Sequence, residues 1–170
     1  VSPIRAYMKP VNPLSLEEIE ALLKACEKRP NRIRNGSSYS SKRPTALRDK
    51  AIILTLLDTG ARVSEVAGIN IGDIDLDLGR ILVMGKGQKQ RYIYIGKLCR
   101  QAIWKYITER YPQKHPPEKE PLFIQKDGIH RMTSQGVLLV VKRLGEKAGV
   151  QNVHPHRFRH TYAIQFLRNG

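Results

Sequence analysis

Acidic residues are scarce in this chain: 15 of its 170 residues are Asp or Glu, against 30 Lys or Arg, giving a formal net charge of +15. An excess this large favours a polyanionic partner over a basic surface that serves only solubility. Nucleic acid is the first candidate, and an acidic membrane is the second. No apolar stretch approaches 18 residues, so we expect no membrane partner.

Cysteine is nearly absent too, with only Cys26 and Cys99, and both lie in apolar helical patterns. We interpret them as reduced core thiols, which are typical of a cytoplasmic protein. Apolar residues make up 41% of the chain, an ordinary share for a globular protein. A chain of 170 residues suits one domain with a core that needs no disulfide.

The apolar spacing predicts a mainly helical chain with one small antiparallel sheet. A capping box, Ser15 to Glu18, begins the first helix. Helices are expected over 15–26, 46–58, 64–67, 97–111, 133–148 and 155–169, and strands over 81–84, 91–95 and 122–124. Residues 1–14, with three prolines, look like a linker, and the basic, Ser-rich residues 29–45 look like a mobile loop.

Two cations stand at turns rather than on solvated helix faces. Arg62 follows a glycine break at Gly60, and Lys86 lies between two glycines at the tip of the expected hairpin. The side chain of Arg62 would project from a turn of fixed geometry. Lys86 could enter a groove, because the glycines beside it carry no side chains. Each cation also has an ordinary explanation when taken alone. Arg62 could form a surface ion pair with Glu65, and Lys86 could be a turn lysine that serves only solubility.

Two further cations, His156 and Arg159, stand three residues apart near the start of the last expected helix. That spacing projects them from one helix face. The free N–H groups of a helix start and the fork of an arginine both favour phosphate oxygens. A lone pair of this kind is also common as surface or capping residues.

In their order and spacing, three segments together resemble the catalytic domain of the tyrosine recombinases, the phage-integrase family: TGARVSEVAGINIGDID, GKGQKQRYIYI and HPHRFRHTYAIQFLRNG. The resemblance runs from about Leu14 to Gly170. It implies a mainly α fold with a small antiparallel β-sheet (α+β), of the DNA breaking-rejoining enzyme type. It also implies site-specific recombination or integration through a 3′-phosphotyrosyl intermediate. The partners would be double-stranded DNA and other recombinase subunits in a tetramer, with no cofactor and no metal, and the protein would be cytoplasmic and DNA-associated.

The resemblance also implies roles for single residues. Arg62 and Arg159 would hold the non-bridging oxygens of the scissile phosphate, and His156 would hydrogen-bond the same phosphate and assist proton transfer. Lys86 would protonate the departing 5′-hydroxyl. Glu65 would orient or charge-balance these groups, and His160 would lie behind them. Contacts with the DNA backbone are predicted for six further cations: Arg32, Arg34, Lys42, Arg43, Lys89 and Arg91.

The family's nucleophile is a tyrosine some tens of residues beyond the second arginine, whereas here only residues 160–170 follow Arg159. Tyr162 stands in the helix body, where the family has a buried aromatic, and we interpret it as core packing. We therefore expect residues 15–170 to be a catalytic domain truncated before its nucleophile. Residues 1–14 would be the linker from a missing N-terminal DNA-binding domain. Such a fragment is predicted to bind DNA without cutting it.

Three alternatives explain part of the pattern. A non-catalytic basic nucleic-acid-binding module explains the charge but not the order of the four cations. A zinc enzyme could use His154, His156 and His160, although no Glu stands inside that motif and arginines are poor neighbours for a dication. A type IB topoisomerase uses similar chemistry, but the compact spacing favours a recombinase.

Overall fold

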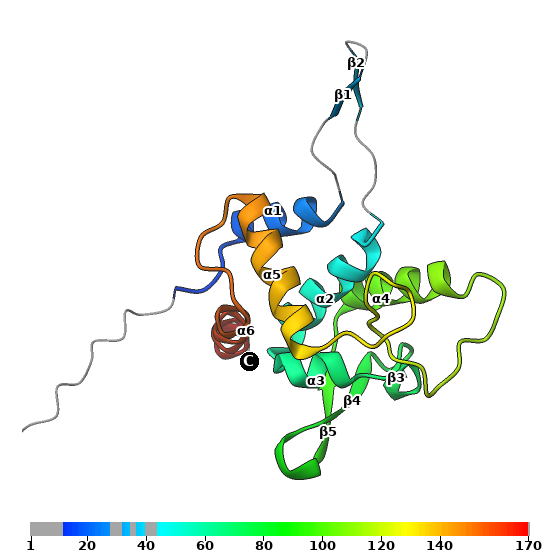
Figure 1. Cartoon of the computed structure of the whole chain (residues 1–170). Helices are drawn as coiled ribbons and strands as arrows, with labels where there is room; N and C mark the ends of the chain where they lie inside the picture. The colour runs from blue at the N-terminus through cyan, green and yellow to red at the C-terminus, as the bar shows by residue number, and fades with distance from the viewer. Residues whose placement is uncertain (1–11, 28–31, 35–36, 40–43, 170) are drawn as a thin grey trace, which may run out of the picture.

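Helix α2 (Ala46–Thr59) forms the centre of the fold in the computed structural model, which describes residues 12–27, 32–34, 37–39 and 44–169. Residues 51–57 of this helix are all buried, as expected of a helix that is apolar all round. Three helices pack against it: α1 (Leu16–Glu27), α4 (Lys97–Arg110) and α6 (Pro155–Asn169). Helix α5 (Ser134–Ala148) lies against α1 and the short α3 (Val63–Gly68), as Figure 1 shows.

A three-stranded antiparallel sheet in the order β3-β4-β5 follows α3 and a short 3-10 turn at Ile71–Asp73. Its strands are β3 (Ile74–Asp75), β4 (Arg80–Met84) and β5 (Gln90–Tyr94). Ile81 pairs with Ile93 and both are buried, which fixes the face of the sheet that meets the core. The β4–β5 hairpin then projects from the body of the molecule, and a 3-10 turn at Lys86–Gln88 forms its tip (Figure 1).

The expected helices are confirmed, each with ends within about two residues of the prediction. The strand predicted over 122–124 is wrong, because that segment makes only isolated bridges, Asn70 with Pro121 and Ile124 with Arg131. Leu122 and Phe123 are fully buried as part of an irregular segment, so their apolar run reflects core packing rather than a ladder.

The basic segment expected to be a mobile loop contains two short strands. Strand β1 (Arg32–Arg34) pairs antiparallel with β2 (Ser37–Tyr39). Ile33 is the one aliphatic residue among these six, which is too little to show the apolar alternation by which a half-buried strand is recognised. Other parts of the prediction, at 28–31, 35–36 and 40–43, and residues 1–11 of the expected linker, lie outside the described residues.

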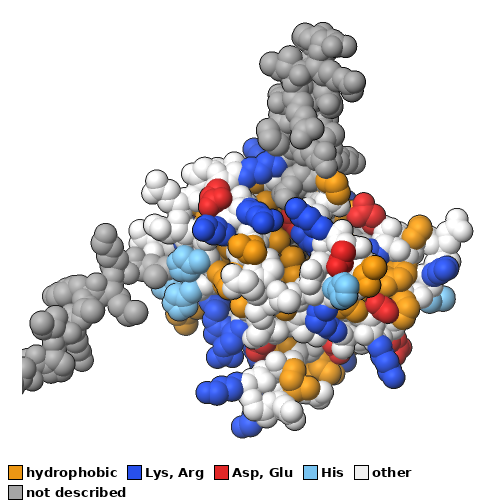
Figure 2. All heavy atoms as spheres, in the orientation of Figure 1, with side chains coloured by type: hydrophobic (Ala, Val, Ile, Leu, Met, Phe, Trp, Pro, Cys, Tyr) orange, Lys and Arg blue, Asp and Glu red, His pale blue; other side chains and the backbone are white. Residues whose placement is uncertain are grey.

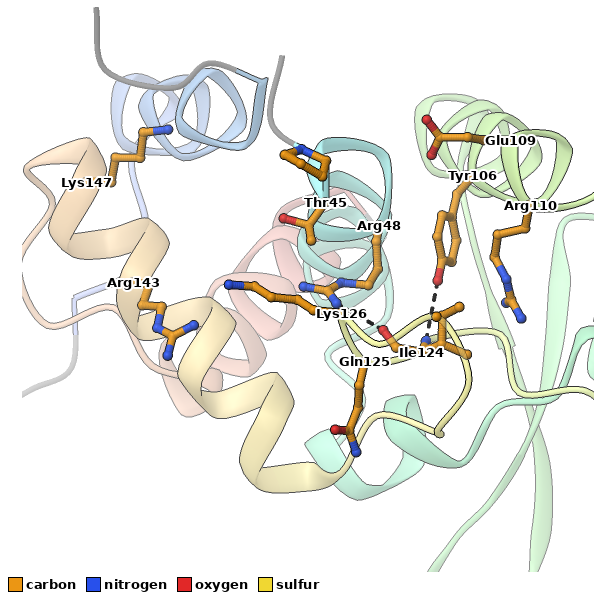
Figure 3. A pocket seen from close by; sticks show the side chains of 12 residues that line it. Thr45, Arg48, Tyr106, Glu109, Arg110, Ile124, Gln125, Lys126, Arg143 and Lys147 are labelled. Carbon is orange, nitrogen blue, oxygen red and sulfur yellow. Dashed lines mark hydrogen bonds between the residues drawn. The ribbon is translucent and has the colours of Figure 1, made fainter. Parts of the chain in front are cut away.

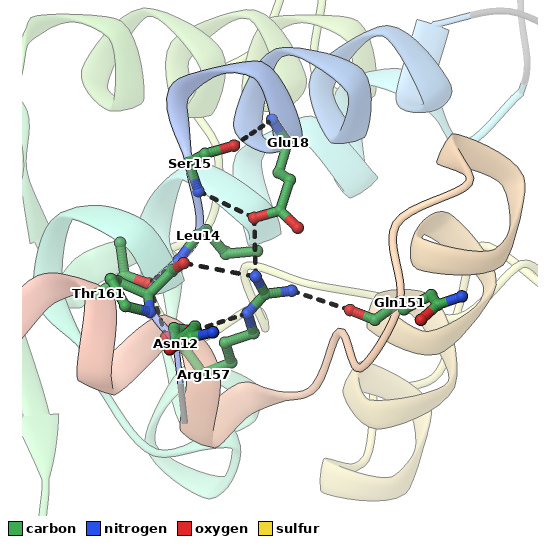
Figure 4. Close-up of polar contacts among 8 residues, drawn as sticks. Asn12, Leu14, Ser15, Glu18, Gln151, Arg157 and Thr161 are labelled. Atoms are coloured by element: carbon green, nitrogen blue, oxygen red, sulfur yellow. Dashed lines mark hydrogen bonds and ion pairs between the residues drawn. The ribbon is translucent and has the colours of Figure 1, made fainter. Parts of the chain in front are cut away.

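Arg157 fastens the start of α6 to the start of α1 (Figure 4). Its Nη2 donates to Oε2 of Glu18 at 2.7 Å, its Nε to the carbonyl of Asn12 at 2.8 Å, and its Nη1 to the carbonyl of Gln151 at 2.8 Å. Thr161 adds a second link, since its Oγ1 accepts the N–H of Leu14 at 2.9 Å. These contacts fix where the first turn of α6 stands.

Glu18 serves both this network and the cap of its own helix. Its Oε2 accepts the N–H of Ser15 at 2.9 Å, and its own N–H donates to Oγ of Ser15 at 3.1 Å, so the predicted capping box is confirmed. Burial raises the pKa of this carboxyl, but the Ser15 N–H and the Arg157 guanidinium together lower it by more than burial raises it. The net shift of the pKa is therefore downward. The charged form of Glu18 therefore stabilises the folded protein.

We expect Arg157→Ala to lower the free energy of unfolding by about 2 kcal/mol, because it leaves a partly buried carboxylate and the carbonyls of Asn12, Pro13 and Gln151 without their donor. Arg168→Ala, on the exposed last turn of the same helix, is the matched control and should change it by less than about 0.5 kcal/mol. Urea unfolding of both variants measures the difference. Equal losses would show that Arg157 is not a fastening residue.

Candidate phosphate-binding site

A sharp corner follows α2, and Gly60 makes it possible. Gly60 adopts the left-handed conformation (φ 58°), and its N–H donates to the carbonyl of Leu56 at 3.0 Å. A Cβ atom built on Gly60 would lie 2.7 Å from Cδ1 of Tyr162. The corner therefore needs glycine for two reasons: its dihedral angles, and the ring of Tyr162 that packs on it. This contact agrees with the interpretation of Tyr162 as a packing residue.

Arg62 stands directly after this corner, at the N-cap of α3. Its backbone N–H donates to Oε2 of Glu65 at 2.8 Å, which closes the first turn of the helix. The Glu65 side chain is only 2% exposed, whereas that of Arg62 is 57% exposed, with its Nη1 3.8 Å from Oε1 of Glu65. The guanidinium of Arg62 is thus placed by a buried carboxylate and remains open to a ligand.

The β4–β5 hairpin reaches the same carboxylate from the sheet. Nη2 of Arg91 lies 3.1 and 3.0 Å from the two oxygens of Glu65. Gly85 begins the turn and donates its N–H to the carbonyl of Lys89 at 2.8 Å. Lys86 follows at the tip and is exposed. The hairpin thus carries an open lysine and is joined at its base to the residue that caps α3.

Helix α6 brings the other two predicted residues. Nη1 of Arg159 donates to the carbonyl of Gly60 at 2.9 Å. His156 is exposed in the first turn of α6, and its ring is parallel to that of His154, with centroids 6.3 Å apart and planes within 6°. Burial, the charge of His156 and the charge of Arg157 lower the pKa of His154. His160 is half-buried in the next turn.

The contacts bring Arg62 and Arg159 to one corner, since Arg159 binds Gly60, two residues before Arg62. Within the described residues, no hydrogen bond or ion pair joins Lys86 or His156 to either arginine. Both side chains are exposed on elements that lead to this corner, the hairpin and the start of α6. Figure 2 shows Lys and Arg side chains on the face that carries α6 and the hairpin.

The structure describes only some of the six cations that are predicted to contact the DNA backbone. Lys89 is exposed on the hairpin, whereas Arg91 donates to Glu65. Lys42 and Arg43 lie outside the described residues, as do the side chains of Arg32 and Arg34. A contact with the DNA backbone stays a prediction for all six.

Sequence reasoning missed a cavity of about 630 Å³ at the first turn of α2 (Figure 3). Five of its lining residues are cations: Arg48, Arg110, Lys126, Arg143 and Lys147. Arg48 and Arg110 donate to the carbonyls of Ile124, Pro121 and Leu122, so they hold the irregular segment of the chain in place. Because α2 has 14 residues, the cavity lies about 20 Å along the helix from the corner at Arg62.

The described residues contain no helix long and apolar enough to cross a membrane. Nor does this part of the chain hold a group of three or more His, Cys, Asp or Glu side chains that could bind a metal ion.

The chain matches the family model described as "Phage integrase family" over residues 12–170. It is similar to the tyrosine recombinase XerC of Staphylococcus epidermidis, with 37% identity over 155 residues, 91% of this chain and 47% of that protein. Its identity with the tyrosine recombinase XerD of Bifidobacterium longum is 40% over 134 residues, 75% of this chain and 43% of that protein. The chain thus spans about half the length of the curated relatives it matches.

Solved structures show the same fold. The crystal structure of XerA recombinase superposes with a TM-score of 0.73 at 30% identity, covering 94% of this chain and 52% of that one. XerH site-specific recombinase bound to difH substrate, in a pre-cleavage complex, gives a TM-score of 0.67 at 24% identity, covering 94% and 43%. The expected fold class is therefore confirmed.

We expect Gly60→Ala to destabilise the protein by at least about 1 kcal/mol more than Gly149→Ala. Gly149 is the matched control because it also ends a helix in the left-handed conformation (φ 70°), with open space where a Cβ would lie. Both variants bear the same backbone strain, but only Gly60→Ala drives a methyl group into Tyr162. Thermal unfolding compares them, and equal losses would contradict the close packing of α6 on the corner.

Proposed function

The chain belongs to the phage integrase family, and from that premise we propose that it forms the DNA-binding catalytic domain of a site-specific tyrosine recombinase. The whole protein would cut and rejoin double-stranded DNA through a 3′-phosphotyrosyl intermediate, with other recombinase subunits in a tetramer. The observation that carries the proposal is the contact between Arg159 and the carbonyl of Gly60, 2.9 Å long, because it brings α6 to the corner that ends in Arg62.

Arg62 and Arg159 would bind the non-bridging oxygens of one phosphodiester. During attack on phosphorus, negative charge gathers on these oxygens, and cations already in place stabilise that charge without reorganising. Arginine suits this role because it stays protonated and offers paired donors to phosphate oxygens. The buried Glu65 would keep Arg62 oriented, since it accepts the Arg62 N–H and lies 3.8 Å from the guanidinium.

Lys86 would supply the proton for the leaving group. The tyrosine hydroxyl would give its proton to His156 as its oxygen forms a bond to phosphorus. The bond from phosphorus to the 5′-oxygen breaks, and that oxygen takes a proton from the lysine ammonium. His156 would hydrogen-bond the same phosphate from the first turn of α6, where free N–H groups also favour an anion. His160 would support the site from the half-buried side of that helix.

Tyr162 is not assigned the role of nucleophile, although it stands only three residues beyond Arg159. Its ring packs on Gly60 and lies 6.1 Å from the ring of Phe166. Tyr92, on the hairpin, has the guanidinium of Arg80 4.4 Å from its ring centroid. Because Tyr162 packs on the corner and Tyr92 lies beside a guanidinium, neither is the expected nucleophile, and we expect the 170-residue chain to bind duplex DNA without forming a covalent adduct.

Binding measurements test whether the two arginines share one phosphate. We expect Arg62→Ala and Arg159→Ala each to weaken duplex binding by this chain about tenfold, the loss expected for a charged phosphate contact. The double variant should lose clearly less than the product of the two effects, because both arginines act on the same group. Lys114→Ala, on an exposed connection, is the control for charge alone and should have little effect. Fluorescence anisotropy gives all four affinities, and fully multiplicative losses would indicate two separate backbone contacts.

Leaving-group chemistry tests the role of Lys86. In the whole protein we expect Lys86→Ala to slow cleavage about 100-fold, the loss expected when a general acid is removed. A substrate with sulfur in place of the 5′-bridging oxygen should restore most of that rate, because a thiol (pKa about 8.5) departs without a proton donor. Arg62→Ala should stay slow on both substrates. Failure of sulfur to rescue Lys86→Ala would remove Lys86 from the proposed role.

A further inference from the structure

We propose that Arg91 is a positioning residue, which fixes the hairpin of Lys86 to the corner of Arg62 through its ion pair with Glu65. The inference rests on the proposed function, because it takes Lys86 as the proton donor. The sequence instead predicts that Arg91 contacts the DNA backbone. The two roles differ in what the side chain binds, and therefore in what its loss would change.

The contacts give Arg91 an internal partner. One of its terminal nitrogens, Nη2, lies within 3.1 Å of both oxygens of Glu65. Glu65 is 2% exposed and Arg91 is 48% exposed, so the pair joins a buried charge to a side chain at the surface. Oε2 of the same carboxylate accepts the N–H of Arg62 at 2.8 Å. Among the described residues, Glu65 is thus the side chain that accepts hydrogen bonds from both the α3 cap and the hairpin.

The face of the strand explains why an arginine occurs here. In β5, Arg91 is on the same side as Ile93, which is buried, because side chains alternate along a strand. Its partner across the ladder is Val83, which is also buried. Arg91 therefore continues the inward face of the hairpin at the point where the hairpin leaves the core. A cation on that face needs a carboxylate, and Glu65 supplies it.

The base of the hairpin rests against the same carboxylate. A Cβ built on Gly85 would lie 3.6 Å from Oε1 of Glu65, so the turn begins in contact range of it. Beyond this point, residues 86–90 are all exposed. The Arg91 pair is thus the last anchor within the described hairpin before the segment that carries Lys86. Without the pair, the tip could pivot, and the position of Lys86 would spread.

Arg62 keeps its place without Arg91. Glu65 is nearly fully buried and has two cations near it, Arg91 at 3.0 Å and Arg62 at 3.8 Å. The bond from the Arg62 N–H to Oε2 of Glu65 lies within the first turn of α3 and does not involve the hairpin. We therefore expect loss of Arg91 to move the hairpin of Lys86 and to leave the Arg62 corner in place.

Salt dependence and amide exchange separate the two roles of Arg91 in the 170-residue chain. We expect Arg91→Ala to leave the slope of log affinity against log salt unchanged, whereas loss of a phosphate contact lowers it by about 1. Amide exchange at Lys86–Gln90 should accelerate in Arg91→Ala and stay unchanged in Tyr94→Phe, a control on an exposed side chain of the same strand. A lower slope with unchanged exchange would overturn the inference.

Cleavage by the whole protein supplies a readout that a general loss of stability would not move. We expect Arg91→Ala to slow cleavage of the oxygen substrate about tenfold or more, with most of the rate restored by the 5′-bridging sulfur substrate, because a misplaced acid no longer matters. Arg91→Lys, which keeps the charge, should retain part of the rate on oxygen. Equal defects of Arg91→Ala on both substrates would overturn the inference.

The outcomes for Lys86→Ala distinguish this inference from the proposed function. If sulfur rescues Lys86→Ala but not Arg91→Ala, Lys86 keeps its role and only the positioning role of Arg91 fails. If sulfur rescues neither variant, the proton-donor role of Lys86 fails first. Rescue of both variants, with unchanged salt slope for Arg91→Ala, is the result that the ion pair predicts.

Discussion

The packing of α6 on a single glycine is the contact on which the arrangement of the cations depends. Gly60 ends the buried helix α2, accepts the guanidinium of Arg159 on its carbonyl, and leaves room for the ring of Tyr162. Because the two residues of α6 are one turn of helix apart, the corner fixes the helix in position and in rotation. Arg157 fastens the same helix to the start of α1. The first turn of α6, with His156, therefore stands where the α2 corner and the α1 cap together place it.

Carboxylates are few in this chain, and among the described residues three of them form ion pairs of 3.0 Å or less with arginines. Asp49 pairs with Arg48 at 2.8 Å, Glu18 with Arg157 at 2.7 Å, and Glu65 with Arg91 at 3.0 Å. Each of these arginines also ties its segment to another part of the chain, either through the ion pair itself or through carbonyls that it reaches. These three carboxylates thus hold the fold, while Lys86, Lys89 and Arg62 stay exposed. This division leaves exposed cations for the anionic ligand that we propose.

Sequence patterns predicted the elements that depend on local periodicity, and missed the ion pairs whose partners are distant in sequence. The buried helix before Gly60, the capping box at Ser15 and the hairpin around Lys86 each follow from residues close in sequence. The apolar run at Leu122 led to a wrong strand prediction, because burial in the core produces the same composition as a ladder. Nothing in the sequence pattern distinguished Arg91 and Arg157 from the other cations, since their partners Glu65 and Glu18 lie 26 and 139 positions away. Motif order predicts that the four cations form one site, and the fold adds the contact of Arg159 with the corner before Arg62.

We propose that Arg62 and Arg159 bind one and the same phosphate group at the Gly60 corner. A crystal structure of the chain soaked with tungstate tests this; tungstate is a heavy tetrahedral oxyanion that stands in for phosphate and is located by its anomalous scattering. We expect one tungstate with its oxygens about 3 Å from the guanidinium nitrogens of both arginines. A tungstate bound to either arginine alone, or only in the cationic cavity at the first turn of α2, would contradict it.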